Sequence, residues 1–379
     1  MAELDELWTE ALHDLAAEAS RLPPLSLRAR RRIRAGRIGA ILASVAGVAG
    51  VCAGVVLGVQ ALNWATRPQA HHSPRPVHWT ATVRARIPLP LSQSTDVAVL
   101  GSAAWVADWY TGKVVRVDLA TRRVTKILHI GGPQDGPISI AAGAGSLWVL
   151  DFSTMRVLRI APASGTVISR IQIRGEATDV AYGDGFVWVI SDGRHLYKID
   201  PSRNAIVRIA PIPGAGPGCI ASPGPQGVWV GCGGVTGISL IDPTSMKAVR
   251  SSPVNPGEYS PQIAPRQRVV WVLTYNGLVR VDPATGKITA TVQTTWDPLT
   301  DAIPSLTVDS TGRVWIAGSP LNVLVPGSPT VHQVADTIGM GITSVVVVGP
   351  NLWADTGKTF IELALNRSLA RTPSRLVNQ

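Results

Sequence analysis

A tryptophan recurs at nearly constant intervals along most of the chain, and this repeat constrains the fold more than any other feature. The repeated segments read AAWVAD, SLWVLD, FVWVIS, GVWVGC, VVWVLT, RVWIAG and NLWADT. Their tryptophans are Trp105, Trp148, Trp188, Trp229, Trp271, Trp315 and Trp353, at intervals of 43, 40, 41, 42, 44 and 38 residues. A sustained period of this length indicates an architecture built from one repeated unit of several elements.

Each repeat has the same order of predicted strands. An apolar strand such as TDVAVLG comes first, then the tryptophan strand, then a third strand such as KVVRVD, and then an outer strand such as RVTKILHIG. Aspartates end the third strands, where they are predicted to accept backbone N–H groups of the following turn; they are Asp118, Asp200, Asp242 and Asp282. Four strands per unit predict an all-β fold, the β-propeller. The 37 Gly and 29 Pro residues suit its many turns.

The last repeat contains only three clear strands, namely ITSVVVV, NLWAD and TFIELAL. Residues 79–88 read as an outer strand that lacks inner partners. We therefore predict a seven-bladed propeller over residues 79–366, in which the N-terminal strand closes the last blade and leaves no exposed sheet edge. Residues 367–379 show no alternation and are expected to form a C-terminal tail.

An uncharged apolar run precedes the repeats, at residues 38–62. It is long enough to cross a bilayer as a helix, and six arginines lie just before it, between residues 28 and 37. The positive-inside rule places the N-terminus in the cytoplasm and the propeller outside. A cleaved signal peptide is the alternative, but its apolar region should be shorter. We expect a single-pass cell-membrane protein with a proline-rich stalk at residues 63–78.

Two features of the N-terminal part predict partners. Residues 1–20 have helical apolar spacing, and residues 1–37 as a whole are expected to form a cytoplasmic amphipathic helix followed by an Arg-rich segment. So short a helix needs a partner, such as a cytoplasmic protein. Within the span, Gly50, Gly54 and Gly58 lie on one helix face, which suggests homodimerisation, although glycine is common in membrane helices generally. The layout is similar to that of actinobacterial membrane proteins that signal inward.

The repeats resemble those of virginiamycin B lyase-like and YVTN-type β-propellers. The matching residues are the W-V-x-D of Trp105–Asp108 and Trp148–Asp151, and the V-R-V-D-P-A-T-G of residues 279–286. The resemblance covers about residues 79–365 and implies a membrane-anchored member of this group. It lacks the patterns of WD40 and quinoprotein repeats. In the blade that contains Trp315, VLVPGSP replaces the Asp-Pro turn.

The resemblance also raises the question of catalysis. Lyase activity in that family depends on a divalent metal with His and Glu near the channel. The histidines and glutamates of the repeats are scattered in sequence; they are His129, His195, His332, Glu176, Glu258 and Glu362. We therefore assign no catalytic residue, metal ligand or cofactor. The favoured function is binding or sensing, and the alternative is an anchored lyase- or lactonase-like enzyme, because propellers host many activities.

Propeller ligands usually bind at one mouth of the central channel, on turns between second and third strands and on loops between blades. The candidates at those positions are Asp108, Trp109, Tyr110, Asp151, Phe152, Asp192, Tyr259, Tyr275, Trp296, Asp297 and Asp301. Aromatic rings with carboxylates could hold a cationic or polycyclic ligand. The alternative is that the aspartates cap turns and the rings cover strand ends. The loop 294–304 is the best single region.

Charge and cysteine content complete the sequence expectations. The net charge of +10 does not predict nucleic-acid binding, because the arginines of the repeats are dispersed and the propeller is expected outside the cell. Cys219 and Cys232 flank one predicted hairpin, where antiparallel pairing places them opposite each other. We predict a disulfide in the oxidising outer compartment. Two free buried cysteines are the alternative.

Overall fold

The computed structural model describes residues 77–132, 136–214, 216, 218–235, 237–257, 260–294, 305–335 and 341–369. The chain divides into two compact units, residues 1–67 and 68–379, and all described residues belong to the second. In these ranges every regular element is a β-strand, as expected for an all-β fold. No helix in the described ranges could cross a membrane. The predicted cytoplasmic helix, span with Gly50, Gly54 and Gly58, and most of the stalk and tail lie outside them.

Five antiparallel sheets each contain four strands that are consecutive in the chain. The first two sheets are β2 (Asp96–Leu100), β3 (Ala103–Asp108), β4 (Lys113–Asp118), β5 (Arg123–His129), then β6 (Pro137–Gly143), β7 (Ser146–Asp151), β8 (Arg156–Ile160), β9 (Val167–Gln172). The third and fourth are β10 (Ala177–Gly183), β11 (Phe186–Ser191), β12 (His195–Asp200), β13 (Ala205–Pro211), then β14 (Ile220–Gly224), β15 (Gly227–Gly231), β16 (Ile238–Ile241), β17 (Ala248–Ser252). The fifth is β18 (Gln262–Arg266), β19 (Val269–Thr274), β20 (Gly277–Val281), β21 (Ile288–Val292).

The two ends of the described chain meet in an eight-stranded sheet of order β22-β23-β24-β25-β1-β28-β27-β26. Its strands are β1 (Val77–Pro88), β22 (Leu306–Val308), β23 (Val314–Ile316), β24 (Asn322–Leu324), β25 (His332–Ala335), β26 (Ser344–Val348), β27 (Asn351–Asp355) and β28 (Thr359–Leu369). β1 pairs antiparallel with β28 along its whole length, as the sequence predicted. It pairs with β25 in parallel through only two residue pairs.

The β1–β28 pair is longer than the apolar alternation indicated. It starts inside the predicted stalk, with Val77 opposite Leu369, and so extends beyond the predicted boundaries at residues 79 and 366. The physical reason is that each strand supplies the backbone donors and acceptors of the other, so the ladder continues where the side chains no longer alternate.

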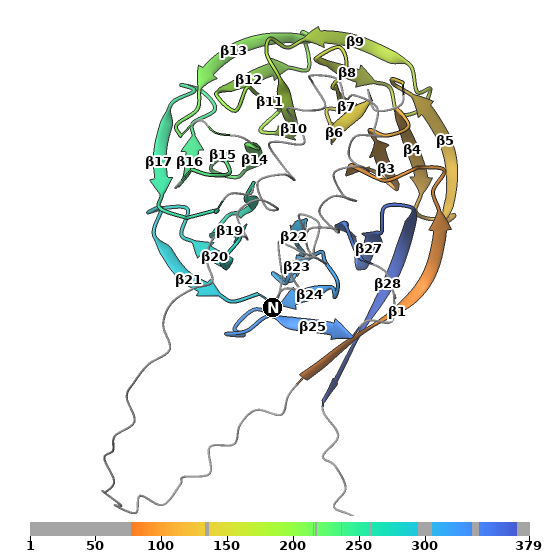
Figure 1. Cartoon of the computed structure of the whole chain (residues 1–379), viewed down its shortest axis with the longest axis vertical. Coiled ribbons are helices and arrows are strands. Elements are labelled where there is room, and N and C mark those ends of the chain that lie inside the picture. The colour runs from red at the N-terminus through yellow and green to blue at the C-terminus, as the bar shows by residue number, and fades with distance from the viewer. Residues whose placement is uncertain are drawn as a thin grey trace, which may run out of the picture. The chain divides into compact units, whose positions relative to one another are not determined.

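The sheets are arranged radially around a centre, with the first strand of each innermost and the fourth at the periphery (Figure 1). The first strands contact one another in the order β2, β6, β10, β14, β18, β22 and β26, and β26 contacts β2 again. This closed cycle is the geometry of a β-propeller, and the inner ends of its first strands enclose a central channel.

The periodic tryptophans pack between successive sheets. Trp148 packs with Val180 and Val189 of the next sheet, and Trp353 packs with Val106 across the β26–β2 junction. Six of the seven have at most 1% of their surface exposed. The exception is Trp271, which is only partly buried, and β22, β23 and β24 in the neighbouring group are just three residues long. The recurrent tryptophan is therefore a packing residue.

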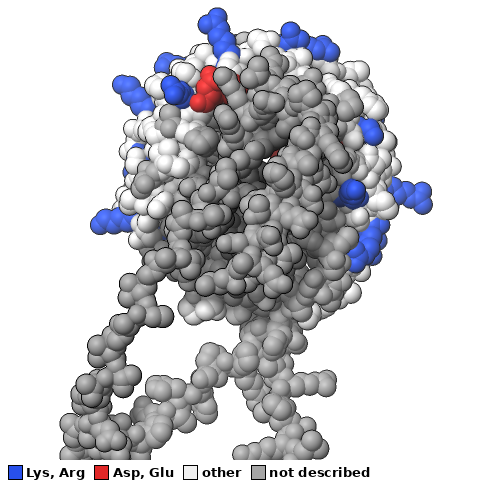
Figure 2. Space-filling view, in the orientation of Figure 1, with Lys and Arg blue, Asp and Glu red and all other residues white. Residues whose placement is uncertain are grey.

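Basic side chains link neighbouring sheets through hydrogen bonds to backbone carbonyl groups. Arg159 Nη1 donates to Pro201 O at 2.6 Å, and Lys198 Nζ donates to Pro243 O at 2.8 Å, in each case in the turn of the next sheet. The turns themselves are held as predicted, since Asp118 accepts the Thr121 N–H at 2.8 Å and the other turn aspartates make equivalent bonds. Other Lys and Arg side chains project around the periphery (Figure 2). The bonds of Arg159 and Lys198 therefore give part of the positive charge a structural use.

Candidate functional site

A cavity of about 500 Å³ lies at the centre of the propeller. Its walls are mainly the beginnings of the first strands, with Asp355 at the end of β27. Because the start of β10 pairs with the end of β11, this end of each sheet also carries the turns between second and third strands. The cavity therefore lies at the mouth where ligands were expected, but deeper than the turns.

The most polar part of the cavity wall joins three successive sheets. Ser139 Oγ on β6 lies 3.0 Å from Asp96 Oδ2 on β2 and 3.2 Å from Asp179 Oδ1 on β10. The two carboxylates also accept backbone N–H groups, Asp96 Oδ2 from Ile140 at 2.8 Å and Asp179 Oδ2 from Ala221 at 2.9 Å. One serine hydroxyl thus lies between two carboxylates from different sheets.

The same strand position links neighbouring sheets elsewhere in the ring. Ser139 Oγ accepts the Val180 N–H at 3.2 Å, and Ser305 Oγ accepts the Val345 N–H at 2.8 Å. Each polar side chain therefore reaches a backbone N–H of the following first strand. Ile220 occupies the equivalent position of β14 and has no side-chain acceptor. Joining sheets is one use of Asp96 and Asp179, but serine is sufficient for that at two positions of the ring.

The cavity carries an excess of negative charge. Asp96, Asp179 and Asp355 line it, and no Lys, Arg or His is found among the described lining residues. Burial raises the pKa of Asp96 to about 7, and repulsion from Asp179 adds to the effect. Burial also raises the pKa of Asp179 and of Asp355. The physical cause in each case is a carboxylate held away from bulk water without a positive partner.

Two buried hydroxyls of the same wall are incompletely bonded. Thr178 Oγ1 has no hydrogen-bond partner among the described residues. Ser94 lies close enough to Asp355 to lower the pKa of that carboxyl, against the larger effect of burial. Its hydroxyl nevertheless makes no hydrogen bond of standard geometry within the described structure. Buried polar groups normally have partners, so these two hydroxyls are exceptions among the described residues of the wall.

The aspartates predicted to bind ligand at the turns are occupied with backbone groups. Asp108 is fully buried, and its carboxylate accepts the Ser92 N–H at 2.7 Å and the Tyr110 N–H at 2.8 Å. Asp151 accepts the Thr154 hydroxyl at 2.6 Å. Both residues cap the turn that follows their strand, which was the alternative interpretation of these residues.

The other predicted residues that the structure describes are not among the residues that line the cavity. Trp109 and Tyr110 contact each other edge to face, with ring centroids 5.0 Å apart. Phe152 is buried, Asp192 accepts the Glu176 N–H at 2.7 Å, and Tyr275 is 46% exposed. The remaining candidates lie outside the described residues; they are Tyr259, Trp296, Asp297 and Asp301.

The carboxylates of the cavity were missed by the sequence interpretation, although the repeat contains a signal for them. Residues 95–98 and 178–181 both read TDVA, with aspartate at the second position of an otherwise apolar first strand. The segment ISIA at residues 138–141 places Ser139 at the same position. A polar residue that returns at one repeat position and faces the axis of the ring would have identified the site.

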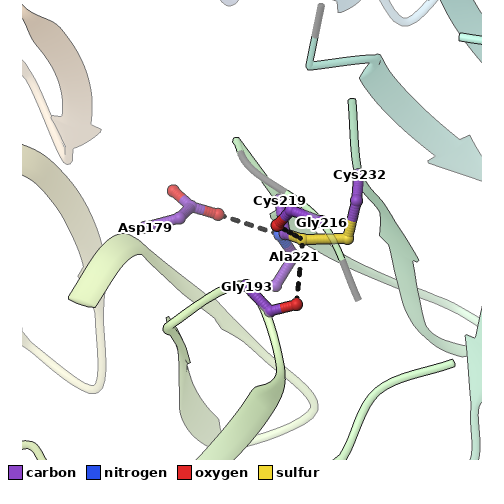
Figure 3. Close-up of a disulfide and its surroundings, with 6 residues drawn as sticks. All are labelled: Asp179, Gly193, Gly216, Cys219, Ala221 and Cys232. Carbon is purple, nitrogen blue, oxygen red and sulfur yellow. Dashed lines mark hydrogen bonds between the residues drawn. A yellow bond between two sulfur atoms is a disulfide. The ribbon is translucent and has the colours of Figure 1, made fainter. Parts of the chain in front are cut away.

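The structure joins Cys219 and Cys232 in a disulfide, with Cα atoms 3.9 Å apart. The bond links the residues flanking β14 and β15, close to Ala221, whose N–H binds Asp179 (Figure 3). Cys219 Sγ lies 3.1 Å from Gly216 O. This is a contact only, because a disulfide sulfur carries no proton. The disulfide therefore fixes the hairpin that supplies one backbone donor of the site.

The histidines and glutamates of the repeats lie in separate places in the part of the chain that the structure describes. They contain no group of three or more His, Cys, Asp or Glu side chains placed to hold a metal ion. Glu362 is buried but bound to Arg122 at 2.6 Å, and His332 lies 3.1 Å from the Ser328 hydroxyl. His129 is on the peripheral strand β5. Glu258 lies outside the described residues.

Known proteins match this chain in structure. No protein-family model matches it, and no curated protein matches it in sequence. A catalytically inactive variant of virginiamycin B lyase from Staphylococcus aureus, solved with quinupristin, is similar with a TM-score of 0.63 and 12% identity over 76% of this chain and 99% of that chain. Hydrazine synthase from Kuenenia stuttgartiensis has a TM-score of 0.59 and 14% identity, over 75% and 98%. The chain therefore has the propeller fold of virginiamycin B lyase, as its repeats predicted.

Proposed function

We propose that this chain is a membrane-anchored, extracytoplasmic β-propeller that binds or senses a ligand or protein at the mouth of its channel. The observation that carries the proposal is the central cavity, whose carboxylates lack a described positive partner. A packed channel with paired charges would favour a purely structural role. A cavity of about 500 Å³ is within the size range of small-molecule sites.

We propose seven blades. In this interpretation the eight-stranded sheet consists of two blades, β22 to β25 and β26 to β28 with β1, which are joined at their outer strands by the short parallel contact of β1 with β25. The interpretation is supported by the four-strand order of the other sheets. It also gives one tryptophan strand to each blade.

The proposed ligand-binding function can be tested by screening the purified full-length chain against a compound library for thermal stabilisation. A ligand that binds only the folded state stabilises it by RT ln(1 + [L]/Kd), so the melting temperature rises with the logarithm of the ligand concentration above Kd. The matched control is Ala181→Trp, which fills the cavity lined by Ala181. Hits that stabilise the wild type but not this variant support the proposal. A screen in which every hit stabilises both proteins equally contradicts it.

Membrane anchoring and topology rest on residues 38–62 and the arginines before them. In cells that express the full chain, external protease should digest the propeller and leave a protected N-terminal fragment. Alkaline carbonate should not extract the protein from membranes. Extraction into the soluble fraction would contradict the anchor, and protection of the propeller would contradict the orientation.

The same segment is proposed to mediate self-association, and the helix before it is proposed to contact a cytoplasmic protein. Gly54→Ile places a bulky side chain on the face shared by Gly50 and Gly58. The variant should lower the signal in a membrane two-hybrid assay. Ile41→Leu in the same span is the control, and an equal signal from both variants would remove the dimer hypothesis.

An anchored lyase- or lactonase-like enzyme is the second candidate, favoured by the structural similarity to virginiamycin B lyase. The test is incubation of the full-length chain with quinupristin and Mg²⁺, followed by chromatography for a converted species. Conversion that depends on the protein would establish the enzyme. The arrangement of the described His and Glu residues leads us to expect none.

A further inference from the structure

The hydroxyl group of Ser139 has too few protons to donate a hydrogen bond to both carboxylates that it contacts. Its hydroxyl oxygen approaches Asp96 Oδ2 and Asp179 Oδ1 at 3.0 and 3.2 Å, but a serine hydroxyl carries a single proton. When this proton is donated to one carboxylate, the contact with the other places two acceptor oxygens together. A second positively charged or protonated group is needed to stabilise both contacts at once.

The carboxylates retain free acceptor positions for such a group. An ionised carboxylate offers about four acceptor positions. On Asp96, two N–H groups and the serine hydroxyl use three of them at most, and Asp179 accepts the Ala221 N–H and shares the same hydroxyl. Asp355 adds a third carboxylate to the wall. The free acceptors therefore border the cavity from several sides.

The other residues that line the cavity indicate which class of cation it suits. The described residues present no group of three or more side chains suited to a metal ion, which argues against a divalent cation held by protein ligands alone. No aromatic ring lines the cavity within the described residues, so the cage typical for a quaternary ammonium is not found there. Between the polar groups lie Ile138 and Ile220, which are only partly buried and suit methylene groups.

Within the binding function proposed above, on which this inference rests, we propose that the cavity binds the primary ammonium group of a linear aliphatic diamine or polyamine between Asp96 and Asp179. The ammonium donates up to three hydrogen bonds, which matches the free carboxylate positions. A proton held by the carboxylate pair leaves to solvent when the ammonium binds, since both neutralise the same charge.

The test uses putrescine and spermidine as probes, titrated calorimetrically into the purified full-length chain at pH 7.5 and pH 6. Neutral 1,4-butanediol and anionic succinate serve as ligand controls. Binding of the amines should be stronger at pH 7.5 than at pH 6, because the proton competes at the lower pH. The two controls should not bind.

The variants Asp96→Asn and Asp179→Asn preserve side-chain shape but remove one charge each and replace one acceptor oxygen by an NH2 donor. Either should weaken putrescine binding by about tenfold or more, the size expected for loss of a charge-assisted hydrogen bond. Asp184→Asn, in the exposed β10–β11 turn, removes an equal charge from the same sheet and should change Kd less than about twofold. Thermal unfolding of each variant without ligand confirms that it is folded.

The outcomes separate this inference from the function on which it rests. If neither amine binds the wild type, or if both asparagine variants bind as tightly as Asp184→Asn, the ammonium site is wrong. In that event, a library compound of another chemistry that stabilises the wild type but not Ala181→Trp would preserve the binding function. If nothing distinguishes wild type from Ala181→Trp, both proposals fail.

Discussion

At one position of the first strands, the choice between serine and aspartate determines the charge of the channel wall. Ser139 and Ser305 link adjacent sheets through a neutral hydroxyl, whereas Asp96 and Asp179 make the equivalent bond with a carboxylate. The neutral residue is sufficient for the link. The aspartates therefore introduce partly buried charge that the architecture does not require, at an energetic cost.

Because the pKa of Asp96 is raised in the folded chain, the free energy of unfolding depends on pH with a definite sign. The pKa of Asp96 is about 7 in the folded chain and 3.8 as the reference for the unfolded one, so between these values the folded state binds more protons. Stability therefore falls as pH rises from about 4 to about 7, by up to about 1.4 kcal/mol per pH unit for one group. In Asp96→Asn, denaturant unfolding at a series of pH values should show a shallower dependence. It should not become flat, because Asp179 and Asp355 still titrate.

Asp184→Asn should follow the wild-type curve and is the control for that experiment. Parallel curves for wild type and Asp96→Asn would mean that Asp96 has the same pKa in the folded and unfolded states. The proposed proton at the carboxylate pair would then have to reside on Asp179.

The turn aspartates are expected to contribute to stability and not to ligand binding. Replacing Asp108 by Ala leaves the Ser92 and Tyr110 N–H groups without their acceptor at a buried site. The free energy of unfolding should decrease by about 2 kcal/mol or more, measured by denaturant unfolding. Ligand affinity in the central cavity should be unchanged, and the exposed Asp118→Ala should cost less. A loss of ligand binding with normal stability would restore Asp108 as a ligand-binding residue.

At the scale of elements, β1 is the strand on which closure of the ring depends. It lies between β28 and β25 and connects segments that are far apart in the chain. Deleting residues 79–88 from the full chain should abolish cooperative unfolding, because β28 loses its partner and buried residues such as Trp79 and Ala81 are removed. Deleting residues 66–75 removes the same length just before it and should leave the melting transition intact. Equal transitions for both deletions would refute the assignment.

The sequence predicted the elements better than the site, for a physical reason. Strand alternation, the tryptophan period and the Asp-turn bonds are local patterns, readable within a few residues. The contact of Asp96, Ser139 and Asp179 joins residues 40 and 43 positions apart, and it forms only because the first strands of three sheets meet at the axis. The hydrogen bond from Arg159 to Pro201 has the same origin.

At the scale of the whole molecule, the Cys219–Cys232 bond adds a constraint to a fold that is otherwise held by packing and strand pairing. With a sequence separation of 13, the loop-entropy relation gives about 3 kcal/mol of stabilisation. Denaturant unfolding of the full chain with and without reductant should differ by that order. The double variant Cys219→Ala, Cys232→Ala should be insensitive to reductant. If both thiols of the untreated wild type react with a labelling reagent after unfolding, the bond is not formed in the cell.

The pairing of β1 with β28 has a mechanical consequence. Any tension applied through residues 1–76 enters the described domain at Val77, the end of β1 that pairs with the last residue of β28. The load therefore falls first on the strand that closes the ring, and the other sheets bear it only after β1 has detached. The pairing of β1 with β28 therefore sets the force that the domain withstands. Separation of these two strands would open the ring at a single junction.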